Sequence, residues 1–173
     1  MARRRRFTPG GYVYHVFNRG SRKGVLFDSC EDYDAFARLM EEARRKRPLR
    51  VIAYSLMRTH FHFLLWPRNT PDVPRFMKWL TETHSRRFHW RRNSQGTGAV
   101  YQARYGSKLI RDDRQFFTVL RYIERNALVA GYVTRAEDWR WCSAWKGDGV
   151  NAFTVDESPI ARPAHWLDLL NDF

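Results

Sequence analysis

Cysteine and lysine are both scarce in this chain of 173 residues. The two cysteines, Cys30 and Cys142, show no C-x-x-C spacing, so we expect no structural disulfide and a reducing, cytoplasmic environment. No apolar run approaches the ~20 residues of a membrane span, which argues against any membrane association. The basic first six residues are not followed by the apolar stretch that a signal peptide requires.

Because lysine is scarce, arginine carries most of the positive charge. Only five of the 31 basic residues are lysines, which leaves 26 arginines against 18 acidic residues and a net charge of +13. Arginine binds phosphate with two N–H groups at once and also stacks on bases. The composition therefore predicts a nucleic-acid partner, with a basic surface that serves only solubility as the alternative.

The charge divides the chain into two parts. Residues 1–135 carry 28 cations and 11 anions, whereas residues 136–173 carry three cations and seven anions. We therefore predict a basic catalytic domain over 1–135 and an acidic tail over 136–173. Its tryptophans Trp139, Trp141, Trp145 and Trp166 indicate that the tail packs on the domain. The distal tail either covers apolar surface or inhibits DNA binding by competing for arginines.

Hydrophobic periodicity predicts strands over residues 12–18, 49–57, 59–66 and 100–110, and helices over 31–45, 71–90 and 112–126. The order β-α-β-β-α-β followed by a third helix matches the α+β class. It fits a ferredoxin-like (RRM-like) antiparallel sheet with helices on one face. The strand over 59–66 would then be central, and the third helix would cover the opposite, active-site face. A small helical tail would follow.

Two histidines lie two residues apart in the predicted strand over 59–66. Because strand side chains alternate, His60 and His62 project from the same face, whereas Phe61 and Phe63 point into a core. Two imidazoles on one face can bind a metal ion, although two hydrogen-bonded neighbours would share this pattern.

A second candidate pair lies on the predicted third helix. Tyr122 and Asn126 are four residues apart and share a face beside the core stripe. The Asn126 carbonyl could complete a three-ligand metal site with the two histidines. The Tyr122 hydroxyl could then act as a nucleophile toward phosphate, with ordinary packing of the tyrosine as the alternative.

Together these residues resemble the HUH single-tyrosine (Y1) transposases. The similarity is greatest to the REP-associated tyrosine transposases, which are related to the IS200/IS605 group. Further matching segments are Tyr14-His15-Val16, Asn18-Arg19-Gly20, Val100-Tyr101-Gln102, Arg104-Tyr105, Ala130-Gly131 and Trp139-x-Trp141-Cys142-Ser143. The resemblance covers about residues 7–145. The chain departs from the family at Ala127, where proline is usual, and at Arg58-Thr59, where Pro-Asn is favoured.

The resemblance implies a bacterial enzyme that cleaves and rejoins single-stranded DNA at REP-type hairpins. A divalent ion, Mg²⁺ or Mn²⁺, would be held by His60, His62 and Asn126, and Tyr122 would form a 5′-phosphotyrosine intermediate. Members of the wider group work as monomers or homodimers, and both states stay open here.

Several arginines are candidate DNA ligands. The matching family motifs favour Arg19 and Arg104, and position in the sequence adds a further set: Arg3, Arg4, Arg5, Arg6, Arg58, Arg121 and Arg125. Some of these could be solvated cations only.

Three other functions compete with strand transfer. A non-catalytic single-stranded nucleic-acid-binding module is the main alternative, because basic and aromatic residues bind single strands without chemistry. A two-histidine phosphoesterase would need two His-x-Thr/Ser motifs, which the chain lacks. A zinc hydrolase would need an acidic base or ligand near the histidines, and none is obvious.

Overall fold

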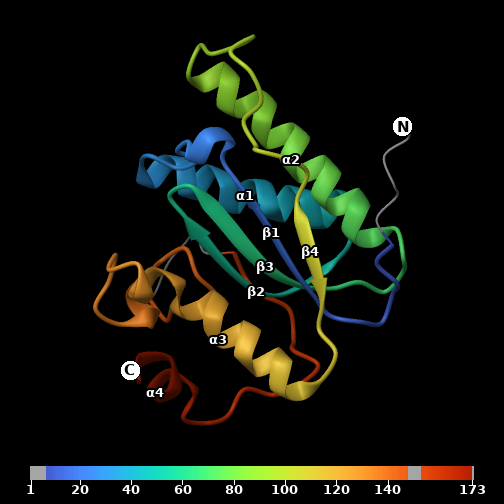
Figure 1. Cartoon of the computed structure of the whole chain (residues 1–173), viewed down its shortest axis with the longest axis vertical. Helices are drawn as coiled ribbons and strands as arrows, with labels where there is room; N and C mark the ends of the chain where they lie inside the picture. Colours follow the sequence, from blue (N-terminus) through green and yellow to red (C-terminus); the bar gives the residue numbers. More distant parts are fainter. Residues whose placement is uncertain (1–6, 148–152, 173) are drawn as a thin grey trace.

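The computed structural model describes residues 7–147 and 153–172. Within these residues ten elements follow one another, and Figure 1 shows how the helices and strands are arranged. The four strands are β1 (Tyr14–Arg19), β2 (Arg50–Met57), β3 (His60–Trp66) and β4 (Gly106–Leu109). The four α-helices are α1 (Cys30–Lys46), α2 (Asp72–Arg91), α3 (Asp113–Val129) and α4 (Trp166–Asn171), with short 3-10 turns at η1 (Ser21–Lys23) and η2 (Ala136–Asp138).

The strands form one antiparallel sheet in the order β2-β3-β1-β4. This is the strand order of the ferredoxin-like arrangement, so the predicted α+β fold is confirmed. β3 lies between β2 and β1, which places the His-x-His segment in the middle of the sheet. The β2–β3 hairpin turns through Arg58 and Thr59, the position expected from the sequence.

Each face of the sheet has its own apolar core. On one face, Phe61 and Phe63 of β3 pack with residues of α1 and α2 such as Phe36 and Phe76. On the other face, Leu64 of β3 packs with buried core residues of α3 such as Leu120. Figure 1 shows the result, with α1 and α2 on one side of the sheet and α3 and α4 on the other.

Side-chain caps fix where two of the helices begin. Ser29 accepts a hydrogen bond from the Asp32 amide at the start of α1. At the start of α3, Asp112 accepts one from the Gln115 amide at 2.8 Å, and the Gln115 side chain accepts from the Arg111 amide. Asp112 therefore caps the helix that carries Tyr122 and sets its start.

The fourth strand is shorter than the predicted span of 100–110. Only Gly106–Leu109 pairs with β1, and Tyr101 makes a separate bridge with Gly20. Tyr101 and Tyr105 are buried in the core, and the chain bends between them. At Gly106 the backbone approaches the Phe17 ring so closely that a Cβ atom would lie 2.4 Å from it. Residues 100–102 therefore pair with the chain at the end of β1, and the bend over 102–104 separates them from β4.

The residues after α3 contact the sheet and the first helix. The Leu56 amide on β2 donates to the Trp141 carbonyl, and Ser143 pairs with Tyr54 on the same strand. The Trp139 indole donates to the Leu56 carbonyl, and the Trp141 indole donates to Asp34 on α1. Residues 139–143 thus lie against β2, and α4 lies against α3.

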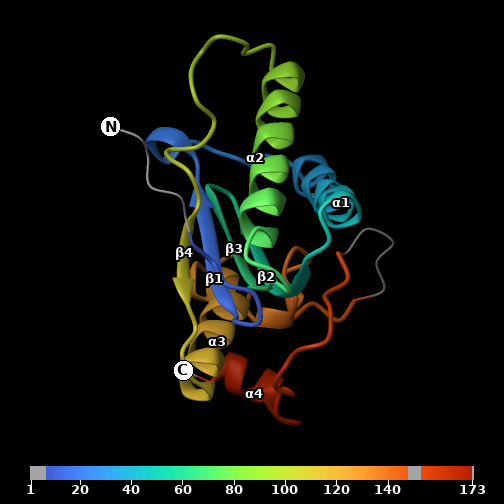
Figure 2. The same ribbon diagram turned by 90° about the vertical axis from the view of Figure 1, so that its right-hand side faces the viewer.

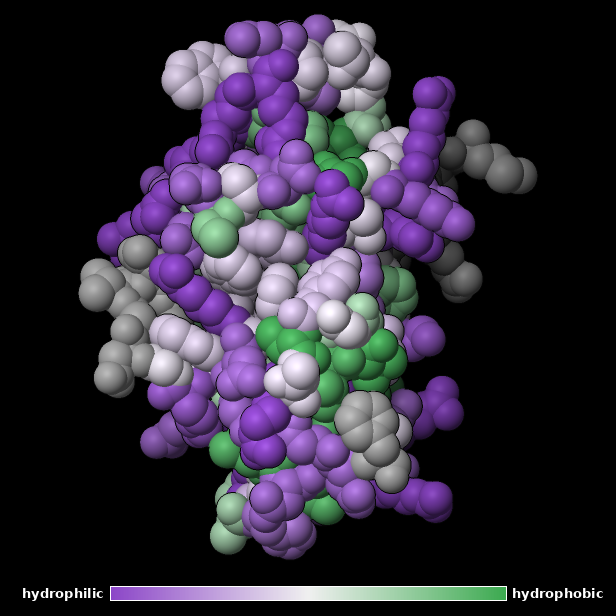
Figure 3. Space-filling view, turned by 90° about the vertical axis from the view of Figure 1, so that its left-hand side faces the viewer, coloured by the Kyte–Doolittle hydropathy of each residue, from purple (hydrophilic) through white to green (hydrophobic). Residues whose placement is uncertain are grey.

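The outer surface reflects the composition. Figure 2 shows α2 extending beyond the sheet with the loop that follows it. The face shown in Figure 3 is mainly hydrophilic around that projecting end, and its hydrophobic residues gather in the lower half. Among the described residues, no helix combines the length and the apolar character needed to cross a membrane.

Candidate active site

The two histidines of β3 lie side by side on the face that α3 covers. The ring centroids of His60 and His62 are 5.1 Å apart. Phe61 and Phe63, on the other face, are fully buried in the core with α1 and α2. His62 is buried, whereas His60, the first residue of the strand, is half-buried. Strand alternation therefore presents both imidazoles to the same space, as the sequence predicts.

The third helix brings the second predicted pair to these histidines. The Tyr122 ring stands edge-on to His62 with a centroid separation of 5.2 Å, and 51% of the tyrosine is exposed. Asn126, one turn further along α3, hydrogen-bonds to the His60 side chain. Residues about 60 positions apart in the sequence thus form one cluster, with its nucleophile candidate open to solvent.

A third histidine, His15 on β1, joins the cluster. Its Nε2 atom lies 3.0 Å from Nδ1 of His62, and its ring centroid is 6.0 Å from that of Tyr122. Sequence reasoning assigned His15 no role, although it stands in the Tyr14-His15-Val16 segment. The alternation of that strand could have indicated it, because His15 and Phe17 share the face opposite to Val16.

The three imidazoles are held in their neutral forms. Burial, together with the neighbouring His15 and His60, lowers the pKa of His62 to about 3. Burial and the charge of Lys108 lower the pKa of His15 to about 4. Burial and the charge of Arg19 lower the pKa of His60, and the hydrogen bond of His60 to Asn126 opposes this shift. A neutral imidazole keeps a lone pair on one ring nitrogen, which is the form that binds metal ions.

The donor set fits a divalent cation. The Nε2 atom of His62 is buried and has no hydrogen-bond partner within the described part of the chain, so this nitrogen lacks a protein contact. His60 and Asn126 lie beside it and supply a second nitrogen and an amide oxygen. Within residues 7–147 and 153–172, no group of three or more His, Cys, Asp and Glu residues could hold a metal. A site here would therefore use the two imidazoles and the asparagine.

The predicted DNA-binding arginines occupy different surroundings. Arg19 pairs across the sheet with His60, and its carbonyl accepts from the Gln102 amide, which brings the segment carrying the exposed Arg104 alongside. Arg58 is exposed and forms an ion pair with Asp28 at 2.9 Å. Arg19 thus lies beside His60, and Arg104 stands two residues after Gln102 on the segment bonded to Arg19. Residues 3–6 lie outside the described residues.

Two of the three arginines of α3, Arg121 and Arg125, are predicted DNA ligands that lie near the C-terminal helix. Arg121 donates to the carbonyl oxygens of Leu169 and Asp172, at 2.7 and 2.8 Å. Arg125 follows one turn later, and burial followed by the charge of Arg121 lowers its pKa. Arg121 therefore has protein acceptors in this structure, and its contacts stabilise the end of α4.

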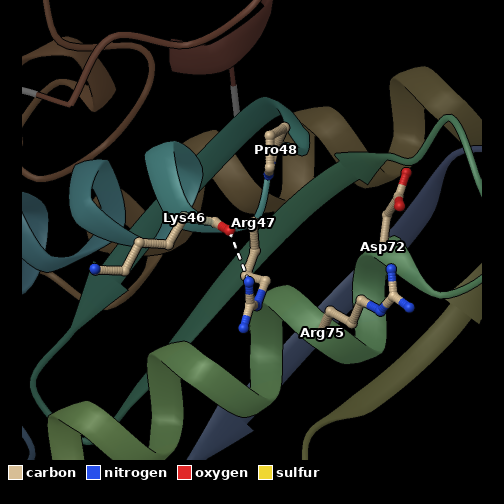
Figure 4. Close-up of a pocket in the computed structure, with 5 residues that line it drawn as sticks. All are labelled: Lys46, Arg47, Pro48, Asp72 and Arg75. Carbon is tan, nitrogen blue, oxygen red and sulfur yellow. Dashed lines mark hydrogen bonds between the residues drawn. The ribbon is translucent and has the colours of Figure 1, made fainter.

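The hollow drawn in Figure 4 lies elsewhere. It is lined by Lys46, Arg47, Pro48, Asp72 and Arg75, between the end of α1 and the start of α2. These helices cover the sheet face opposite to α3. None of the predicted site residues lines it, so this hollow is separate from the histidine cluster.

The chain matches the family of IS200-like transposases over residues 10–126. That span contains His60, His62, Tyr122 and Asn126. The match extends over more than half of the chain, and the protein therefore belongs to this transposase family.

Two relatives narrow the comparison. A Haemophilus influenzae protein that is provisionally named a REP-associated tyrosine transposase is 26% identical over 149 residues, covering 81% of this chain and 83% of the relative. A solved structure of a REP-associated tyrosine transposase bound to a REP hairpin superposes with a TM-score of 0.65. It shares 20% identity and covers 93% of this chain and 99% of that one. The second match shows that the fold is shared along nearly the whole chain.

Proposed function

We propose that this transposase is a metal-dependent single-stranded DNA endonuclease and strand transferase that acts on REP-type hairpins through Tyr122. The observation that carries the proposal is the placement of a half-exposed tyrosine edge-on to a buried, neutral histidine whose Nε2 has no partner. The proposed nucleophile, Tyr122, is then in direct contact with a side chain of the proposed cation site, His62.

The proposed substrate follows from the relatives and from the charge. The structural relative is bound to a REP hairpin, and the other relative is named for REP association. This chain carries a net charge of +13, Arg19 pairs with His60 across the sheet, and the exposed Arg104 follows two residues after Gln102, whose amide donates to Arg19. Arginine side chains bind phosphate oxygens in pairs, which would place a DNA backbone near Tyr122.

His60, His62 and Asn126 would hold the cation, Mg²⁺ or Mn²⁺. When bound, the cation would polarise a phosphate oxygen as a Lewis acid. The protein's own contribution is to keep both imidazoles neutral through burial and to orient His60 through the hydrogen bond between its Nδ1 atom and the Thr59 hydroxyl, at 3.2 Å.

The reaction exchanges one phosphodiester bond for another. The Tyr122 hydroxyl oxygen would bond to the scissile phosphorus while the bond from phosphorus to the 3′ oxygen of the preceding nucleotide breaks. The proton that the tyrosine loses is balanced by the proton that the departing 3′ oxygen gains. The products are a 5′-phosphotyrosine and a free 3′-hydroxyl, and the reverse attack rejoins a strand without an external energy source.

The non-catalytic binding module is less well supported. Modules of that kind use an open sheet face, on which bases stack against aromatic side chains. Here α3 packs on one face through Leu120 and Ile123, and α1 and α2 occupy the other. Binding alone also gives no role to the buried Nε2 atom of His62, which has no hydrogen-bond partner among the described residues.

Incubation with an end-labelled REP-type hairpin and Mn²⁺ tests the proposal. We expect a covalent protein–DNA adduct with the wild-type chain and none after chelation. His60→Ala and His62→Ala should abolish the adduct and Asn126→Ala should reduce it. All three should retain hairpin binding, because the electrostatic attraction is spread over many arginines. Equal cleavage with and without chelator would refute the metal site, and binding without any adduct would favour the binding module.

A further inference from the structure

His15 occupies a position that the proposed chemistry does not yet explain. It lies on β1, next to β3, and both His15 and His62 are more than 90% buried. The two rings are tilted by 34° at a centroid distance of 5.1 Å, and His15 Nε2 lies 3.0 Å from His62 Nδ1. That distance is a hydrogen bond, so one of the two nitrogens carries the proton and the other accepts it.

The direction of this hydrogen bond decides what His62 can do. If His15 donates, the neutral His62 must carry its own proton on Nε2, and that atom has no lone pair for a cation. If His62 donates from Nδ1, its Nε2 keeps the lone pair. Only the second arrangement leaves the buried, unpartnered Nε2 of His62 able to bind a metal ion.

We propose that His15 is a positioning residue that accepts the Nδ1 hydrogen of His62 and thereby holds the His62 ring with Nε2 available as a metal ligand. The inference rests on the proposed metal-dependent function. Partners of this kind fix the tautomer and ring orientation of metal-binding histidines, and their loss typically weakens metal affinity by 10–100-fold. His15 is not itself a ligand in this assignment, because its Nε2 is engaged by His62.

Two substitutions of His15 distinguish a role as hydrogen-bond acceptor from a role as a ring that only fills space. His15→Gln places an amide oxygen near the former Nε2 position, whereas His15→Phe fills a similar volume without an acceptor. We expect His15→Phe to weaken Mn²⁺ binding by about 10–100-fold and His15→Gln to weaken it only a few-fold. Binding is measured by calorimetry with Mn²⁺ on the full chain without DNA, so the readout does not depend on cleavage.

His84→Phe is the matched control. His84 is also a buried histidine with a ring-nitrogen partner, Tyr101, but it lies among α2 and core residues on the opposite face of the sheet. Its loss removes a buried imidazole without touching the candidate site, so Mn²⁺ affinity should stay at the wild-type value. A loss equal to that of His15→Phe would mean that general destabilisation explains both results.

The tautomer of His62 provides a second readout. Nitrogen-15 NMR of the metal-free wild-type chain should show the proton of His62 on Nδ1, and His15→Gln should preserve it. A proton on Nε2 in the wild type would overturn the inference even if a variant failed to fold.

The binding experiment has its own contrary outcomes. Equal loss of Mn²⁺ affinity in His15→Gln and His15→Phe would make His15 a ligand, and unchanged affinity in both would remove its role. Absence of Mn²⁺ binding by the wild type would refute the proposed metal function, while the tautomer measurement would still test the hydrogen bond.

Discussion

The Trp166 indole donates a hydrogen bond of 2.6 Å to the carboxylate of Glu124, a fully buried residue two positions after Tyr122. The other carboxylate oxygen accepts from Arg162 and from Ser143, each at 2.7 Å. Three donors from the C-terminal part of the chain thus meet one charge on the helix that carries the proposed nucleophile. Buried charges need such partners, so this cluster ties the C-terminal part to α3.

Removing Arg162 should destabilise the protein strongly. Arg162→Ala leaves the buried Glu124 carboxylate without its cation, and breaking a buried ion pair typically costs about 3–5 kcal/mol of unfolding free energy. Urea denaturation measures the change. Arg58→Ala is the control, because its ion pair with Asp28 is solvent-exposed and should contribute little. Equal effects of the two substitutions would contradict the role assigned to Glu124.

A chain truncated before Gly147 should lose its solubility. The truncation removes Arg162, Trp166 and Leu170, which exposes the apolar face of α3 and leaves Glu124 without two of its partners. Static light scattering and circular dichroism of the truncated chain check this. A folded truncated chain with tighter hairpin binding or faster cleavage would instead support inhibition by the acidic tail.

Two neutralised acids provide the matched test of inhibition. Glu157→Gln and Asp168→Asn remove exposed negative charges while keeping the covering segment. We expect hairpin affinity to stay within a few-fold at low salt, where unscreened charge would have its greatest effect. A marked gain in affinity would favour competition between these acids and DNA phosphates.

Hairpin affinity should fall steeply with salt concentration. Each neutralised phosphate contributes a log–log slope of about 0.7 in single strands and about 0.9 in duplex DNA. Deleting Arg3 to Arg6 should flatten this slope if the amino-terminal arm contacts DNA. The control is Arg44→Gln, since Arg44 already pairs with Glu41 and Asp156. Fluorescence anisotropy at several salt concentrations measures the slope, and an unchanged slope after the deletion would exclude the arm from the interface.

His84 should make folding stability depend on pH. Burial, followed by the charge of Arg92, lowers its pKa from 6.5 to about 3. The unfolded chain therefore binds a proton below pH 6.5 that the folded chain does not, and stability falls as pH decreases from 6.5 toward 3. His84→Gln should reduce the proton uptake on unfolding by about one, measured by urea denaturation between pH 4.5 and 8. The control removes the exposed imidazole of His165. Identical pH dependence in His84→Gln and wild type would contradict the assignment.

The sequence predicts the order of the helices and strands and the two pairs of site residues, because both follow from local patterns. Strand alternation places His60 and His62 together, and helical spacing places Tyr122 and Asn126 together. The capping of α3 by Asp112 is likewise local. The contact between the two pairs needs only the ferredoxin-like order with a helix on the second face.

The features that the sequence does not reveal depend on contacts between distant segments. His15 and His62 are 47 residues apart, and their hydrogen bond depends on the register of β1 against β3. In the sequence, Glu124 is indistinguishable from an ordinary acidic residue of a helix. Only the structure shows its contacts with Arg162 and Trp166. The bend between Tyr101 and Tyr105 could not be predicted without knowing that both tyrosines are buried.

The most direct test of the central claim is the identity of the residue that becomes attached to DNA. The full chain is incubated with a REP-type hairpin and Mn²⁺, and the adduct is mapped by proteolysis and mass spectrometry. We predict a 5′-phosphate on Tyr122 in the wild-type chain. Tyr122→Phe should form no adduct but should bind the hairpin with an affinity within a few-fold of wild type. Tyr132→Phe, which alters another exposed tyrosine, should leave the adduct unchanged. An adduct that persists in Tyr122→Phe, or that maps to a different residue, would contradict the assignment of Tyr122 as the nucleophile.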